Sequence, residues 1–261
     1  MNVAEPRPAL ENSLPKESTR PLADAARAPQ LALVVPALRE AANLLVLLER
    51  IRCSLDPVGI NYEVIIVDDD SRDGTDAIVT EIAQRDARVR LLTRTGVRGL
   101  AGAVIHGWQG TDAEILGVMD ADLQHPPELL PELWRELQSG NDIVVASRYA
   151  PHGSRPNWSR FRHLLSQLAI WMTLPLQRPG IRVKDPMSGF FLVRRACIRE
   201  LTLQSQGFKI LLEILVRGNV HSAAEVPFVF GHRHAGRSKA SLKVGFEYVA
   251  LLRRLWKVRR R

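Results

Sequence analysis

The residues best suited to chemistry are two carboxylates that follow an apolar run near the middle of the chain. The stretch "EILGVMDADLQHPPELL", residues 114–130, leads into Asp120 and Asp122 and then meets two prolines. Residues two apart on an extended strand point to the same side, so these carboxylates would repel each other without a cation between them. Oxygen ligands favour Mg²⁺ or Mn²⁺, and Gln124 adds a third oxygen if the chain stays extended. The alternative interpretation is a solvated turn.

Charged residues also stand at the ends of two other apolar runs. "YEVIIVDDD" ends in three aspartates, 68–70, and "DIVVASRY" carries Arg148 close to its end. The aspartates would accept hydrogen bonds from a nucleobase or ribose, or else form a turn and helix cap. Neither a G-x-G-x-x-G sequence nor a P-loop is present, so a Rossmann oxidoreductase is unsupported. The three charged strand ends predict one polar site if they meet at a common edge.

The elements that must position these residues alternate along the chain. Continuously apolar strands separated by helical patterns predict a parallel sheet covered on both faces, with ligands beyond the carboxyl ends of the strands. Strands are expected over 31–36, 62–70, 89–94, 114–122, 142–149, 188–195 and 221–234. Helices are expected over 39–55, 73–86, 99–110, 126–140, 159–174, 207–219 and 242–257.

A set of basic and hydroxyl groups is suited to binding phosphate. Arg162 and Ser166 share a helix face, since they are four residues apart, and Arg148 ends a strand. Arg233 and Lys239 lie in the glycine-containing sequence "RHAGRSK". Guanidinium groups bind phosphate through paired hydrogen bonds, although each of these residues could instead be an ordinary surface cation. The histidines have no metal-ligand spacing, and the sequence places His125 in a loop.

The chain as a whole carries a formal net charge of +8, which predicts an anionic partner. Six basic residues fall within the last nine, 253–261, and would attract anionic lipid at ~1 kcal/mol each. A solvated basic tail is the alternative. Nucleic acid is not the expected partner, because interleaved aromatics and a recognised motif are both missing.

The domain organisation predicted from composition has three parts. Residues 1–30, rich in proline and without an apolar signal region, are expected to form a disordered leader. Residues 31–240 are expected to form one domain that carries the candidate catalytic residues, and 241–261 a basic amphipathic C-terminal helix. No run reaches the roughly 20 apolar residues of a membrane-spanning helix. The two cysteines favour a reducing compartment, so we expect a cytoplasmic protein, peripheral on the cytoplasmic face of the membrane.

Seven segments, in order, resemble family 2 glycosyltransferases, and among these the polyprenyl-phosphate branch. They are "VVPALRE", "EVIIVDDDSRDGT", "GLAGAVIHGW", "MDADLQHPPEL", "ASRY", "DPMSGFFLVRR" and "EVPFVFGHRHAGRSK". The resemblance covers residues 31–239. It implies an α/β protein with the GT-A fold, a mostly parallel central sheet and helices on both faces. It also implies the transfer of a sugar from a nucleotide sugar to a lipid phosphate, with inversion.

The resemblance further implies roles for individual residues. Asp122 and Arg148 would act in catalysis, and the helix around 164–174 would lie in the membrane interface. Nucleotide-sugar binding would fall to Pro36, Glu40, Val67, Asp69, Asp120, Ala121, Arg233 and Lys239. The metal, Mg²⁺ or Mn²⁺, would be held by Asp120, Asp122 and Gln124. The acceptor phosphate would be held by Arg148, Arg162 and Ser166.

One motif departs from the family pattern. The first motif of the family reads Pro-x-Tyr-Asn-Glu, whereas Leu38 and Arg39 occupy its third and fourth positions here. The missing ring leaves the choice of nucleobase open. We expect mannose from GDP-mannose as the donor and a dolichyl-type phosphate as the acceptor. The alternatives are a UDP-sugar donor such as glucose or an N-acetylhexosamine, a different acceptor, or a non-catalytic relative that only docks on membranes.

Overall fold

A computed structural model describes residues 28–96, 98–151, 160–203, 209–229, 231 and 242–259, and only the backbone of 160–165, 242–247 and 258–259. The strands are β1 (Leu31–Ala37), β2 (Tyr62–Asp68), β3 (Val89–Thr93), β4 (Ile115–Val118), β5 (Ile143–Ser147), β6 (Phe191–Arg194) and β7 (Ala223–Pro227). The helices are α1 (Ala41–Leu55), α2 (Thr75–Arg85), α3 (Leu100–Gln109), α4 (Leu130–Gln138), α5 (Arg160–Thr173), α6 (Ile210–Arg217) and α7 (Leu242–Arg259).

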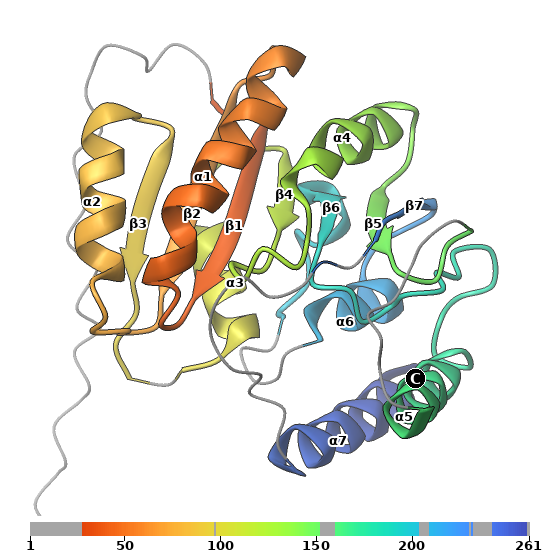
Figure 1. Cartoon of the computed structure of the whole chain (residues 1–261). Helices are drawn as coiled ribbons and strands as arrows, with labels where there is room; N and C mark the ends of the chain where they lie inside the picture. Colours follow the sequence, from red (N-terminus) through yellow and green to blue (C-terminus); the bar gives the residue numbers. More distant parts are fainter. Residues whose placement is uncertain are drawn as a thin grey trace, which may run out of the picture.

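The strands form one sheet of seven in the order β3-β2-β1-β4-β6-β5-β7. All neighbours pair in parallel except β6, which runs antiparallel to both β4 and β5. This arrangement confirms the expected mostly parallel α/β sheet with helices (Figure 1). The antiparallel strand β6 has a consequence for the site, because its first residue lies at the edge where β4 and β5 end.

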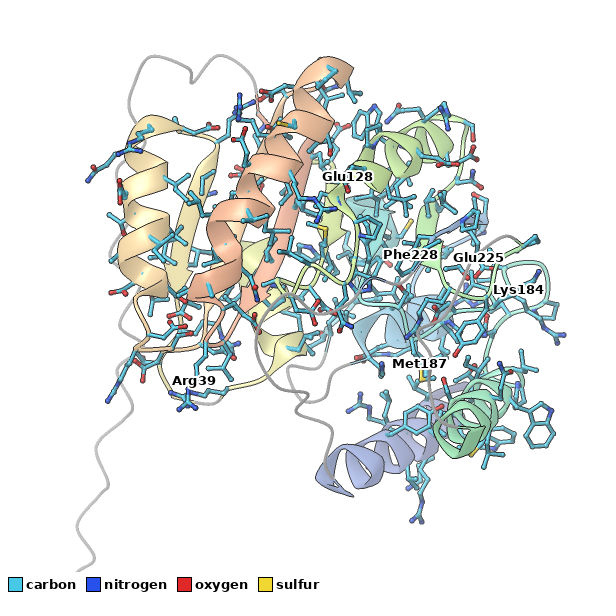
Figure 2. The ribbon with its side chains drawn as sticks, viewed as in Figure 1. Arg39, Glu128, Lys184, Met187, Glu225 and Phe228 are labelled. Atoms are coloured by element: carbon cyan, nitrogen blue, oxygen red, sulfur yellow. The ribbon has the colours of Figure 1, made fainter. Side chains whose placement is uncertain are left out.

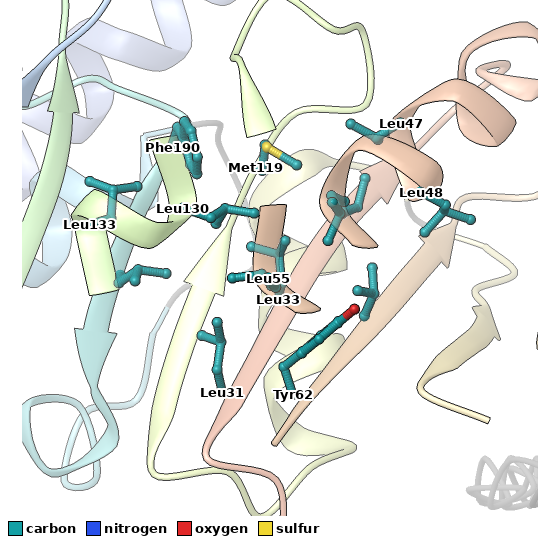
Figure 3. Packing of buried hydrophobic residues seen from close by; sticks show 14 of the residues in the cluster. Leu31, Leu33, Leu47, Leu48, Leu55, Tyr62, Met119, Leu130, Leu133 and Phe190 are labelled. Carbon is teal, nitrogen blue, oxygen red and sulfur yellow. The ribbon is translucent and has the colours of Figure 1, made fainter. Parts of the chain in front are cut away.

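Two apolar clusters cover the two faces of the sheet. The odd-numbered residues of β1, including Leu31 and Leu33, pack with α1, α2 and α4 (Figure 3). The even-numbered residues, including Val34, pack with α3 and α6 on the other face. Strands buried on both faces read as continuous apolar runs, and this is why the sequence predicted them well.

A third apolar cluster joins α5, α6 and α7 beyond the sheet. Tyr248, Leu251 and Leu255 of α7 are buried against Leu212 of α6 and partly buried residues of α5. The Tyr248 hydroxyl donates to the carbonyl of Ala169 in α5, so α5 and α7 lie side by side (Figure 1). Within the described part of the chain, no helix combines the length and the apolar composition needed to cross a bilayer.

Candidate active site

The carboxyl ends of β1, β2, β4 and β5 lie at one edge of the sheet. β1 pairs in parallel with β2 and β4, and β6 relates β4 to β5 in the same direction. The three charged strand ends found in the sequence therefore meet at a common edge, as predicted. This edge is the candidate site.

At the β1–β2 end, Pro36 and Val67 are cross-strand partners. Val67 is fully buried, while Glu40, at the start of α1, is partly exposed and accepts a hydrogen bond from Asn43 Nδ2 at 2.7 Å. The loop between β1 and α1 contacts the loop that follows β2, because the Arg39 N–H donates to Ser71 Oγ at 2.8 Å. Arg39 itself is exposed and adopts a φ of 60° (labelled in Figure 2).

Asp69 is the anchor of the neighbouring loop. Its carboxylate is only 4% exposed, binds Arg94 at 2.8 Å and accepts the backbone N–H of Gly99 at 2.8 Å. Gly99 precedes α3, so Asp69 fixes the start of this helix next to the end of β2. The predicted nucleotide role of Asp69 stays a prediction, since its carboxylate has protein partners in this structure.

The expectation of an extended strand through residue 122 is wrong. β4 ends at Val118, and Asp120 and Asp122 lie in the turn that follows. The turn closes because Asp122 Oδ1 accepts the N–H of Gln124 at 3.1 Å and Leu123 adopts a φ of 62°. The same-side argument for the carboxylates therefore fails, although the turn still keeps both at the carboxyl end of β4.

Gln124 links this turn to the distant glycine-containing segment. Its carbonyl accepts the N–H of Gly231 at 3.0 Å, and its Nε2 donates back to the Gly231 carbonyl at 3.3 Å. Gly231 lies two residues before Arg233, which, like Lys239, is outside the described residues. The segment that carries both predicted phosphate-binding cations thus begins beside the predicted metal motif.

His125 lies in the predicted loop but is buried, which the sequence did not indicate. Its ring contacts the rings of Phe190 and Phe228, with centroids 5.6 and 5.5 Å away. Its Nδ1 lies 3.6 Å from Asp120 Oδ2. Burial holds the pKa of His125 well below its ordinary value, so the ring is neutral at pH 7. The ring therefore supports the Asp120 turn by packing.

At the carboxyl end of β5, the Asp185 carboxylate binds the Arg148 side chain. Nε and Nη2 of Arg148 lie 2.8 Å from Oδ2 and Oδ1 of Asp185, and the Arg148 N–H donates to Oδ2 at 3.2 Å. Asp185 is fully buried and the Arg148 side chain is 14% exposed. The pKa of Arg148 is raised despite the cost of burial, because of this carboxylate. Asp185 begins the segment "DPMSGFFLVRR", but the sequence pattern assigned no role to this residue.

The predicted acceptor residues are brought together in part. Tyr149 lies under the Arg148 guanidinium, with its ring centroid 5.5 Å from Cζ, and its hydroxyl shares a 2.7 Å hydrogen bond with Ser166 Oγ. Arg148 and Ser166 are therefore linked through Tyr149. Arg162 lies one turn before Ser166 on α5, and its side chain is outside the described residues.

Lys209 is a second residue that sequence reasoning missed. Its Nζ donates to the carbonyl of Met187 at 3.1 Å, between the sheet and the α5–α7 pair (Met187 is labelled in Figure 2). Burial lowers the pKa of Lys209 to about 8, and the nearby Arg148 acts in the same direction. No strand-end pattern marks this lysine, which precedes α6.

The candidate metal ligands lie in the turn after β4 and are two carboxylates and, as a prediction, Gln124. Among the described residues, no group of three or more His, Cys, Asp or Glu is placed to hold a metal ion. Asp120, with a side chain 33% exposed, and Asp122 supply oxygen ligands at the end of β4. Mg²⁺ is usually bound by one or two carboxylates together with substrate phosphates, so this donor set fits such an ion.

The sheet and its charged carboxyl edge define a GT-A glycosyltransferase fold. The sequence profile of "Glycosyl transferase family 2" matches residues 32–202, well over half of the chain. The protein therefore belongs to glycosyl transferase family 2.

The chain is similar in sequence to two relatives and in fold to one solved structure. It is 42% identical to a dolichol-phosphate mannosyltransferase of Pyrococcus furiosus, over 87% of this chain and 64% of that protein. It is 38% identical to a dolichol-phosphate mannosyltransferase of Mycosarcoma maydis, over 88% of this chain and 80% of that protein. Its fold is similar to that of a Pyrobaculum calidifontis mannosyltransferase in complex with GDP-Man and Mn²⁺, with a TM-score of 0.59 and 19% identity over 88% of this chain and 65% of that chain.

Proposed function

We propose that the protein transfers a mannosyl group from GDP-mannose to a polyprenyl phosphate of the dolichyl type, with inversion at the anomeric carbon. The observation that carries this proposal is the identity of 42% and 38% to dolichol-phosphate mannosyltransferases over 87% and 88% of this chain. The site supports it, because acidic groups at β4 and basic groups at β5 face one edge of the sheet.

The donor would lie across the ends of β1, β2 and β4. Pro36, Val67, Glu40 and Asp69 would line the nucleoside, and the turn at Asp120–Gln124 would hold a divalent metal, Mg²⁺ or Mn²⁺. When bound, such an ion neutralises the charge that develops on the departing diphosphate. Arg233 and Lys239 would add cations to that diphosphate, and the contact of Gly231 with Gln124 supports this placement.

The acceptor would lie on the β5 side, with its phosphate near Arg148, Arg162 and Ser166. A phosphate monoester has a second pKa of roughly 6 and is an anion at neutral pH, so it can attack the anomeric carbon without a protein base. The role of the chain is then to orient two anionic groups and to stabilise charge, which is catalysis by preorganised electrostatics.

The lipid part of the acceptor fits the pair of helices beyond the sheet. Trp171 of α5 is 67% exposed and Trp256 of α7 is 42% exposed. Both line a groove of about 830 Å³, together with Leu252 and the cations Arg253 and Lys257. Exposed tryptophans beside cations are typical of helices that lie at a membrane surface, which supports the proposal that the protein binds an anionic membrane surface. The cytoplasmic face is part of the same proposal.

A donor screen tests the proposal. The full chain is incubated with dolichyl phosphate in vesicles, Mn²⁺ and one nucleotide sugar at a time, and the released nucleoside diphosphate and the glycolipid are measured. GDP release that depends on GDP-mannose, with a mannosylated lipid, is expected. UDP release from UDP-glucose or UDP-N-acetylglucosamine would show that the donor is a UDP-sugar instead of GDP-mannose. No lipid product with any donor would refute the proposal.

A further inference from the structure

The segment 185–189 touches both halves of the candidate site. It precedes β6, whose Phe191 pairs with Val118 of β4 on one side and Val145 of β5 on the other. Because β6 is antiparallel to both strands, the chain before it enters at their carboxyl edge. The segment therefore lies between the Asp120 turn and Arg148.

On the acceptor side, Asp185 fixes the guanidinium of Arg148. The two side-chain bonds of 2.8 Å use Nε and Nη2, so they set the plane of the guanidinium as well as its position. Asp185 is itself held, since its N–H donates to Glu225 Oε1 of β7 at 3.1 Å (Glu225 is labelled in Figure 2). The Asp185 carboxylate is fully buried and binds Arg148, while the Asp185 backbone is tied to β7, so the position of Arg148 is fixed relative to the sheet.

On the donor side, Gly189 leaves the space in which the Asp120 carboxylate lies. A Cβ at residue 189 would lie 2.7 Å from Asp120 Oδ2 and 3.1 Å from its Cγ. Any side chain there would displace this carboxylate, although the φ of Gly189 is not in the left-handed region. The glycine is needed here for close approach.

The segment between these two residues is fixed as well. The Ser188 N–H donates to the Asp185 carbonyl at 3.2 Å, and the Ala146 N–H of β5 donates to the Phe190 carbonyl at 3.0 Å. The carbonyl of Met187 accepts the Lys209 Nζ. Five consecutive residues thus have a defined shape between two groups of opposite charge.

We propose that the segment Asp185–Gly189 is a positioning element that sets the donor half of the site relative to the acceptor half. Asp185 orients Arg148 toward the acceptor phosphate, and Gly189 keeps the Asp120 carboxylate in place on the metal and diphosphate side. This inference rests on the proposed function for what Arg148 and Asp120 bind. Asp185 and Gly189 act through these two residues, so they are positioning residues and not catalytic ones.

Two variants of the full chain test the two sides separately. Asp185→Asn is expected to weaken the binding of farnesyl phosphate, a short polyprenyl phosphate, on the order of 10- to 100-fold, since a misplacement of about 1 Å costs this much. Its binding of Mn²⁺–GDP, followed by calorimetry, should stay within about twofold. Gly189→Ala is expected to show the reverse pattern, with Mn²⁺–GDP weakened on the order of 10-fold or more.

Matched controls separate positioning from general damage. Asp142→Asn alters an aspartate at the opposite end of β5, where its carboxylate accepts the N–H of His221 at 2.7 Å. Gly110→Ala places a Cβ 3.1 Å from Leu92, away from the charged edge. Both controls should bind both ligands as the wild type does. If Asp185→Asn does not fold, Glu225→Ala removes the support of Asp185 and should weaken farnesyl phosphate in the same direction.

The outcomes distinguish this inference from the proposed function. Equal loss of both ligands in Asp185→Asn and Gly189→Ala, or unchanged binding in folded variants, would overturn the positioning role. Arg148→Ala is measured in parallel. If it weakens farnesyl phosphate and Asp185→Asn does not, the inference fails and the acceptor assignment stands. If Arg148→Ala binds farnesyl phosphate normally, the acceptor assignment of the proposed function fails.

Discussion

The two halves of the site are built in different ways. On the β1–β2–β4 side, each functional loop follows directly on its own strand, and its carboxylate accepts a backbone N–H of its own or a neighbouring loop, as Asp122 does with Gln124 and Asp69 with Gly99. On the β5 side, Arg148 depends on Asp185, 37 residues away, and Ser166 reaches the site through Tyr149. The first half, the local side, is a set of strand–turn units that the distant glycines Gly189 and Gly231 approach. The second half, the assembled side, depends on side chains from separate parts of the chain. A substitution on the local side should therefore disturb mainly its own turn, whereas one on the assembled side should disturb residues that are distant in sequence.

The largest expected effect is on the local side. Asp122→Ala should lower mannosyl transfer by at least on the order of 100-fold, because it removes charge stabilisation of the departing diphosphate. Activity is measured as glycolipid formed at several Mn²⁺ concentrations, with Asp142→Asn, at the opposite end of β5, as a control. Full activity of Asp122→Ala in the presence of a chelator would exclude a metal role for this turn.

The stability of the assembled side should depend on the ion pairs that join α6 to α7. Glu213 of α6 is 3% exposed and pairs with Arg217 and with Arg254 of α7, the latter at 3.6 Å. Glu213→Ala should reduce the free energy of unfolding by about 3 kcal/mol, because a buried ion pair loses one partner. Denaturant melts check this.

Glu132→Ala serves as the control for Glu213→Ala, since the half-exposed Glu132 pairs at 3.8 Å with the exposed Arg135. Its loss should cost less than about 0.5 kcal/mol. Similar losses in the two variants would show that α7 does not depend on Glu213.

The contact with the membrane should also belong to the assembled side. Trp171→Ser should lower the partition of the protein into anionic vesicles about tenfold, since an exposed aromatic surface no longer inserts. Flotation at physiological salt measures this partition. Leu45→Ser, which changes an exposed leucine of α1 on the other side of the molecule, should leave it unchanged. Equal partition of both variants with the wild type would place the membrane contact elsewhere.

A smaller effect is expected from the buried charge near Arg148. The pKa of Lys209 is lowered to about 8 from an ordinary 10.5, so between these values the unfolded chain binds a proton that the folded chain does not. The stability of the wild type relative to Lys209→Met should therefore rise as the pH rises from 8 to 10.5. Thermal melts of both proteins across this range test the sign. A difference that does not change with pH would show that Lys209 titrates normally.

The smallest expected effect is a difference in reactivity between two cysteine thiols. Cys53 is exposed on α1, whereas Cys197 is buried and burial raises the pKa of its thiol to about 11. A thiol reagent should therefore modify one cysteine rapidly and the second only on unfolding, because the thiolate is the reactive form. Peptide mapping identifies the modified residue. Rapid labelling of Cys197 would indicate local opening next to β6.

Most strands and helices were predictable because their patterns are regular. The expected strands overlap every strand of the described sheet, and the errors fell at strand ends. β7 stops at Pro227 although a strand was expected through residue 234, and β4 stops at Val118, where the chain turns instead of continuing to Asp122. Hydrophobic pattern cannot locate such an end, since Met119 and Ala121 are buried in the turn as well. Among the site residues, Asp120, Asp122 and Arg148 stood out because each follows an apolar run.

The sequence by itself determined the parallel alternation, the charged strand ends and the resemblance to family 2 glycosyltransferases. Parallel strands end at one edge, so charge at their ends could be combined without coordinates. Only the tertiary structure decided that Asp185 binds Arg148 and that His125 is buried. It also brought Lys209 close to Arg148 and Asp185. These contacts follow from the antiparallel insertion of β6 between β4 and β5. A strand's direction depends on which neighbours it pairs with, and its own residues do not record that choice.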